Sequence, residues 1–85
     1  MTSQATAHDI RDRVRRQVVR ICHAEVRDED NIFELGLLSS LYALRLVEAI
    51  EREFGLELSD DDLKVSNFRA VDAISSLVAR LLEPR

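Results

Sequence analysis

The apolar stripe between Leu41 and Gly55 limits the possible folds of this chain more than any other feature of its sequence. Apolar residues recur there at three- and four-residue steps, which is the spacing of one helix face; they are Ala43, Leu44, Leu46, Val47, Ile50 and Phe54. Glycine is the usual residue just after a helix end, and Ser39 and Ser40 stand where helix-starting residues are favoured. The pattern predicts an amphipathic helix over residues 40 to 54.

Two further stripes of this kind predict a helix near each end of the chain. The first covers residues 8 to 24, with arginines on its other faces and apolar side chains at Ile10, Val14, Val18, Ile21 and Cys22. The last helix has Ser66 or Asn67 as its capping residue, Pro84 at its end, and a stripe of Val71, Ile74, Leu77, Val78 and Leu81. We expect one shared core, made of Val14, Val18, Ile21, Leu46, Val47, Ile50, Phe54, Val71, Ile74 and Val78.

The connections complete the predicted fold. Residues 25 to 39 read as a long acidic loop, in which Gly36 permits a sharp turn and the apolar anchors are Ile32, Phe33, Leu35, Leu37 and Leu38. Ser59 followed by three aspartates predicts the capped start of a short helix or turn, because carboxylates favour a helix N-terminus. The expected fold class is all-α, a small four-helix bundle with a long loop between the first and second helices. We expect one domain over residues 8 to 83, preceded by a disordered tail over residues 1 to 7.

Length and composition agree with a single small domain. An 85-residue chain buries roughly 60% of its unfolded surface, and 46% apolar residues suffice for one core. One cysteine, Cys22, excludes an internal disulfide and fits a reducing compartment. No apolar stretch has the length of a signal peptide or a membrane span. We therefore expect a cytoplasmic monomer that does not enter a membrane.

The net charge of −4 is unevenly distributed along the chain. Residues 1 to 27 hold six arginines against three acidic residues, whereas residues 28 to 85 hold six basic and 13 acidic residues. The acidic part contains the serine pair and the helix after it. An acidic surface beside a functional site steers basic partners towards that site, although for many of these residues a solvated surface is a sufficient explanation.

The most specific motif precedes the central helix and reads Phe33-Glu34-Leu35-Gly36-Leu37-Leu38-Ser39-Ser40-Leu41. With Leu46-Val47-Glu48 and Glu51-Arg52-Glu53-Phe54-Gly55, it resembles the acyl carrier protein family over roughly residues 30 to 82. The resemblance implies a small acidic helical bundle that carries a 4′-phosphopantetheine arm, derived from coenzyme A, on one serine. Counting back from Phe54-Gly55 places the arm on Ser40. Ser39 stands where the family usually has an acidic residue, and it is the alternative attachment point.

A serine at a helix start is suited to hold a phosphate ester, because the helix N-terminus offers free amide N–H groups and a favourable dipole to an anion. No base near Ser40 in the sequence would make it a nucleophile, and no catalytic set can be assembled. His8 and His23 stand 15 residues apart, and Cys22 belongs to an apolar stripe. The aspartates before Leu63 lack the alternating ligands, the glycine and the glutamate of an EF-hand loop. We expect neither a metal site nor an enzyme.

Three classes of function remain open. The leading one is a discrete, non-catalytic carrier that tethers an acyl or aminoacyl group as a thioester on an arm at Ser40. The second is a helical interaction module that keeps the bundle and has lost the arm. The third is nucleic-acid binding through the arginine-rich first helix, which the net acidic charge disfavours.

The resemblance also implies the partners, which are a phosphopantetheinyl transferase and the enzymes that load and tailor the cargo. Tyr42 and Arg45 replace acidic residues that carriers of fatty acid synthesis usually place early in the second helix. This altered charge pattern indicates dedicated partners. The run from Ser40 to Glu48, with the later Asn67-Phe68, resembles free-standing carriers of polyketide and nonribosomal peptide pathways, some of which form extender units. The resemblance thus implies such a pathway; fatty acid synthesis and D-alanyl transfer are the alternatives. The partners are expected to read Leu41, Tyr42, Arg45 and Glu48, which lie within two turns of Ser40.

Overall fold

Four α-helices and one 3₁₀ turn make up the regular structure of residues 6–83, the part of the chain that the computed structural model describes. The helices are α1 (Ala7–Cys22), α2 (Ser40–Phe54), α3 (Val65–Phe68) and α4 (Val71–Leu82), and the turn η1 (Asp60–Asp62) precedes α3. The predicted all-α fold class, with a long loop between the first two helices, is confirmed.

The N-terminal helix begins earlier than expected. Thr6 caps it, since Thr6 Oγ1 accepts a hydrogen bond from the N–H of Asp9 at 3.0 Å, and α1 starts at Ala7. The tail expected over residues 1 to 7 therefore gives way to ordered structure at its last two residues, and its first five lie outside the described residues. The helix ends at Cys22 and is followed by the capping residue His23, whose backbone takes left-handed angles with φ 56°.

The C-terminal helix is capped differently from the prediction. Neither Ser66 nor Asn67 caps it, because both lie within α3. The residue before α4 is Ala70, whose side chain makes no capping hydrogen bond. Asn67 instead donates from Nδ2 to the carbonyl oxygen of Asp62 at 2.9 Å, which ties α3 to η1. Pro84, the expected end of the last helix, lies outside the described residues.

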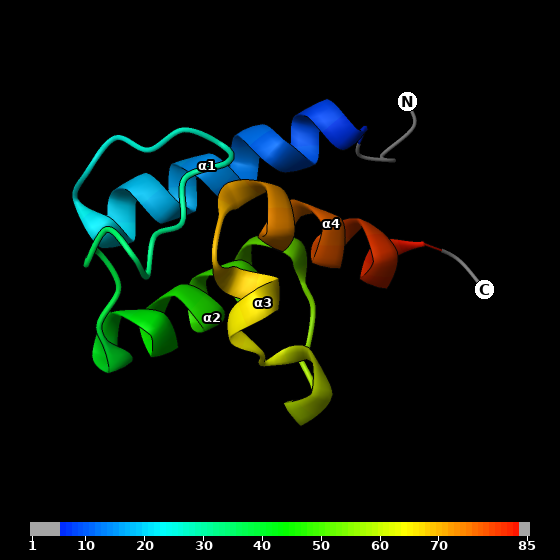
Figure 1. The fold of residues 1–85 in the computed structure, drawn as a ribbon. Helices are drawn as coiled ribbons and strands as arrows, with labels where there is room; N and C mark the ends of the chain where they lie inside the picture. The colour runs from blue at the N-terminus through cyan, green and yellow to red at the C-terminus, as the bar shows by residue number, and fades with distance from the viewer. Residues whose placement is uncertain (1–5, 84–85) are drawn as a thin grey trace.

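Helix α1 packs against both α2 and α4, and α3 packs against α4. Figure 1 shows that α1 and α2 run in opposite directions, so the end of α1 lies near the start of α2. The core between the elements contains the fully buried residues Val14, Val18, Ile32, Leu46, Ile50, Val71, Ile74, Leu77 and Val78. Three expected core residues, Ile21, Val47 and Phe54, are only partly buried and pack against the edge of this core.

The loop between α1 and α2 is held to the far end of the chain by main-chain hydrogen bonds. The N–H of Ile32 donates to the carbonyl oxygen of Arg69 at 2.7 Å, and the N–H of Asp72 donates to that of Asp28 at 2.9 Å. Ile32 is fully buried. The loop therefore has a fixed path over the bundle, which determines where α2 begins.

Leu35 does not anchor this loop, contrary to the prediction. Asn31 Oδ1 accepts hydrogen bonds from the N–H groups of Phe33 and Glu34, both at 3.1 Å, and so starts a tight turn. Leu35 lies in this turn just before Gly36, with 56% of its surface exposed. The anchoring falls to the residues on either side of the turn.

Three arginines of α1 hold the helix to its neighbours. Arg13 Nε lies 2.7 Å from Glu53 Oε2, and its guanidinium lies 4.5 Å from the centre of the Phe54 ring. Arg15 pairs with Asp28 at 2.8 Å. Arg11 lies near the carboxylates of both Asp28 and Asp72. Three of the six arginines in residues 1 to 27 therefore form ion pairs with other parts of the fold.

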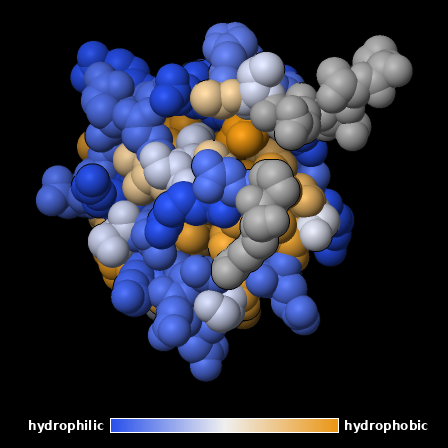
Figure 2. Space-filling view, turned by 90° about the vertical axis from the view of Figure 1, so that its right-hand side faces the viewer, coloured by the Kyte–Doolittle hydropathy of each residue, from blue (hydrophilic) through white to orange (hydrophobic). Residues whose placement is uncertain are grey.

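Figure 2 shows the molecule from the right-hand side of Figure 1, where α1 begins and α4 ends. Hydrophobic residues are visible on this face between hydrophilic side chains, which lie around its margin and also across its middle. Leu81, expected in the buried stripe, is 38% exposed in the last turn of α4, and Leu82 is 39% exposed. Within residues 6–83, no helix has the length and apolarity needed to cross a bilayer.

Candidate functional site

The two adjacent serines at the start of α2 have different roles. Ser39 has an extended backbone and precedes the first helical residue. Its Oγ accepts a hydrogen bond from the N–H of Tyr42 at 3.4 Å, and its carbonyl oxygen accepts one from Ala43 at 2.7 Å. Serine and aspartate are both among the preferred N-cap residues. Ser39 can therefore cap the helix where the family pattern has an acidic residue.

Ser40 is the first residue of α2 and is exposed to solvent. Among the described residues its hydroxyl has no hydrogen-bond partner, unlike that of Ser39. The N–H groups of Ser40 and Leu41 belong to the first turn and have no acceptor within the helix, and this turn contains no acidic residue. An anion on Ser40 Oγ would thus lie at the positive end of the helix dipole with no carboxylate of that turn beside it.

The residues before the serines fix their position. Gly36 takes left-handed angles, with φ 73°, which a residue with a Cβ rarely adopts. The N–H of Leu37 then donates to the carbonyl oxygen of Ile32 at 3.1 Å and closes the turn. Leu38 is buried directly before the helix. Ser40 therefore follows a buried anchor by two residues and is held in place from both sides.

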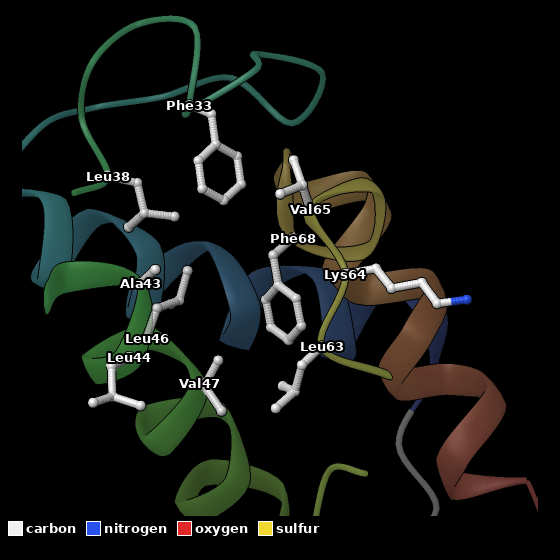
Figure 3. Close-up of a pocket in the computed structure, with 10 residues that line it drawn as sticks. All are labelled: Phe33, Leu38, Ala43, Leu44, Leu46, Val47, Leu63, Lys64, Val65 and Phe68. Carbon is white, nitrogen blue, oxygen red and sulfur yellow. The ribbon is translucent and has the colours of Figure 1, made fainter. Parts of the chain in front are cut away.

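One flank of α2 is apolar. A pocket of about 220 Å³ opens between α2 and α3, below the loop, and Figure 3 shows Val47 and Phe68 on its opposite walls. Lys64 directs its Nζ away from these walls (Figure 3). The lining residues are Phe33, Leu38, Ala43, Leu44, Leu46, Val47, Leu63, Lys64, Val65 and Phe68. This flank of α2 therefore offers a nonpolar surface.

The other flank of α2 is polar and basic. A groove of about 330 Å³ lies between α1 and α2. Two arginines of α2 and one of α1 line it together with one acidic residue; the lining residues are Arg20, Ile21, Arg45, Glu48, Ala49 and Arg52. We call this the arginine groove.

The structure gathers some of the predicted recognition residues and separates others. Arg45 and Glu48 both line the arginine groove. Leu41 and Tyr42 are exposed by 58% and 38% but lie outside the lining of the groove and of the apolar pocket. Arg52 was not among the predicted recognition residues, although its spacing from Arg45 and Glu48 puts all three on one helix side.

Two of the three glutamates of α2 make hydrogen bonds within the fold. Glu51 Oε2 accepts a hydrogen bond from the N–H of Leu58 at 2.9 Å and so fastens the chain after the helix. Glu53 accepts hydrogen bonds from Arg13 and Gln17. Of the three glutamates of α2, only Glu48 has no such partner among the described residues.

The other candidate reactive groups have structural or solvent positions. Cys22 is buried, and burial raises the pKa of its thiol, so the thiolate is disfavoured at neutral pH. His8 and His23 are exposed. Between residues 6 and 83 no three His, Cys, Asp or Glu side chains are grouped as metal ligands.

Comparison with known proteins identifies the family. The profile described as "Phosphopantetheine attachment site" matches residues 12–81, a range that holds the serine pair and the cores of all four helices. No curated protein and no solved structure matches the chain significantly. The matched domain is the attachment site of covalently bound 4′-phosphopantetheine, and its members are in general carriers that meet phosphopantetheinyl transferases and biosynthetic enzymes. This small helical bundle, with a serine exposed at the start of its second helix, belongs to the phosphopantetheine-binding acyl carrier protein family.

Proposed function

We propose that the protein is a discrete carrier whose Ser40 hydroxyl bears the 4′-phosphopantetheine arm. The division of roles between the two serines carries this proposal. The Ser39 hydroxyl is engaged in capping α2, whereas the Ser40 hydroxyl is exposed and has no partner among residues 6–83. Modification of Ser40 leaves the cap intact, but modification of Ser39 would remove a capping interaction that is worth about 1 kcal/mol in comparable helices.

Attachment requires only the Ser40 hydroxyl and its surroundings from this chain. Ser40 Oγ forms a bond to the arm's phosphorus, the pyrophosphate bond of coenzyme A breaks, and adenosine 3′,5′-bisphosphate leaves. The hydroxyl proton passes to the transferase. The phosphodiester that results is an anion, which the N-terminus of α2 favours. When bound, the arm supplies a terminal thiol that holds acyl groups as thioesters.

The two flanks of α2 suggest what is carried and for whom. The apolar pocket is large enough for the hydrocarbon part of a short acyl group, since an apolar cavity of about 150 Å³ can hold benzene. Arg45 and Arg52 interrupt the acidic surface of α2, and two of its glutamates are occupied within the fold. We assign the carrier to a polyketide or nonribosomal peptide pathway of the cytoplasm, with its loading and tailoring enzymes as partners.

Intact-mass spectrometry tests the attachment site. The wild-type protein and the variants Ser39→Ala and Ser40→Ala are incubated with coenzyme A and a promiscuous phosphopantetheinyl transferase. We expect the wild type and Ser39→Ala to gain the mass of one phosphopantetheine, and Ser40→Ala to gain nothing. Circular dichroism of all three proteins shows whether the helical fold is kept.

Two results would contradict the proposal in different ways. If Ser40→Ala is modified and Ser39→Ala is not, the arm belongs on Ser39. If a folded wild-type protein gains no mass with any transferase, the chain is an interaction module that has lost the arm.

A further inference from the structure

Two sets of three arginines, among the eleven of this protein, have different surroundings. Arg11, Arg13 and Arg15 pair with carboxylates of the loop, α2 and α4. In contrast, Arg20, Arg45 and Arg52 form no ion pair with any carboxylate of residues 6–83. The second group lines the arginine groove.

These three arginines are concentrated around one hollow by the packing of α1 on α2. Arg45 and Arg52 lie on one side of α2, and Arg20 faces them from α1. Glu48 is the one acidic residue of the lining, so the groove has a local charge of +2 in a protein with a net charge of −4. Like charges held close together repel each other, and a negatively charged partner would relieve this repulsion.

We propose that the arginine groove docks an acidic surface of the enzyme that acts on the arm-borne group. This inference rests on the proposed attachment at Ser40. Arg45 follows Ser40 by five residues, which is about 8 Å along the axis of α2, so a partner bound in the groove lies beside the arm. Guanidinium groups bind carboxylates through two parallel hydrogen bonds, and arginine is enriched in protein interfaces.

The composition of the groove favours a protein over a nucleic acid. Glu48 lies between Arg45 and Arg52 on the same helix side, and it would repel a continuous row of phosphates. A protein surface can match this order with a hydrogen-bond donor opposite Glu48 and one carboxylate on each side of that donor. The half-buried Ile21 and the buried Ala49 provide an apolar floor, which protein interfaces use at their centre.

Chemical-shift mapping on the full-length, ¹⁵N-labelled protein tests the inference with hexaglutamate as the probe. We expect hexaglutamate to shift the amide signals of Arg20, Arg45, Glu48 and Arg52 at low salt, and added salt to weaken the effect. The double variant Arg45→Glu/Arg52→Glu should bind about tenfold more weakly, since each reversal replaces an attraction to hexaglutamate by a repulsion. The control Arg69→Glu/Arg80→Glu changes the net charge by the same amount, but at one residue before α4 and one within it. It should bind hexaglutamate as the wild type does.

Three outcomes would overturn the inference. They are no shift in the groove, equal loss of binding in both double variants, and tighter binding of a 12-nucleotide single-stranded DNA to the same amides. The mass test with coenzyme A and a transferase is run on the same wild-type sample. If the wild type gains no mass, the carrier function itself is refuted. If it gains the mass but hexaglutamate does not shift the amide signals of the arginine groove, only the docking proposal is refuted.

Discussion

The two flanks of helix α2 differ in the contacts that they make with neighbouring helices. On the side of α3, apolar side chains of α2 meet Phe68 and Val65 around a nonpolar pocket. On the side of α1, one end of the flank is closed by the Arg13–Glu53 pair, and the other end is the arginine groove. Both flanks begin at the N-terminus of α2, where Ser40 lies.

This difference separates stability from recognition. Burial of apolar surface supplies most of the free energy of folding, whereas exposed ion pairs contribute about 0–1 kcal/mol each. Changes on the apolar flank should therefore alter the stability of the bundle, and changes on the basic flank should alter the binding of partners.

The largest effect is expected from Phe68→Ala on the apolar flank. Phe68 is 5% exposed and belongs to the core cluster, so its truncation should lower the free energy of unfolding by about 3–5 kcal/mol. Urea denaturation followed by circular dichroism measures this. Val65→Ala, at a side chain that is 64% exposed, is the control and should change stability by about 0.5 kcal/mol or less. A Phe68→Ala protein as stable as the control would show that α3 is not needed to hold the bundle.

An intermediate effect is expected from the cargo. A hexanoyl thioester on the arm can bury a few methylene groups in the apolar pocket, at about 0.8 kcal/mol each. The hexanoyl form should melt several degrees above the free-thiol form, and the methyl signals of Val47 and Leu46 should shift. An acetyl thioester is the control, because it is too short to contribute as much burial. Shifts confined to Arg45 and Arg52 would place the cargo on the basic flank and reverse the division.

The smallest effect is expected from Glu53→Gln on the basic flank. Arg13 and Glu53 are each 28% exposed, so the loss of this ion pair should cost less than about 1 kcal/mol, and high salt should shrink the difference from wild type. Glu48→Gln removes a glutamate without such a pair and is the control. A cost of more than about 2 kcal/mol, measured by urea denaturation, would mean that the basic flank stabilises the fold as the apolar flank does.

The sequence predicts α2 from Ser40 to Phe54, and the structure has the same bounds. It does so because all the signals are local: a capping serine, a helical stripe and a terminal glycine. The short third helix or turn was expected to start at Ser59, where the structure has η1, and the separate helix α3 follows it. The position of α3 was not predicted, since its four residues are held by the burial of Phe68 and by the hydrogen bond from Asn67 to Asp62. Such a short helix depends on tertiary contacts more than on its own propensity.

The same distinction applies to the candidate site. The serine pair is readable from its motif, and the structure adds which hydroxyl is engaged in the cap. The arginine groove could not be found from the sequence, because Arg20 and Arg52 are far apart in the chain and meet only through the packing of α1 on α2. Leu35 was misplaced for a similar reason, since hydrogen bonds to Asn31 determine the turn in which it lies.

The hydrogen bonds of the loop to Arg69 and Asp72 have a consequence during protein synthesis. Arg69 and Asp72 follow α2 by 15 and 18 residues, so the loop and α2 are synthesised before the two residues whose main-chain groups hold the loop in place. Helix α2 can form by then, but its first turn is not yet held in the position that the bundle gives it. We therefore expect a transferase to meet the native surroundings of Ser40 only after α4 has been synthesised and has packed against the loop.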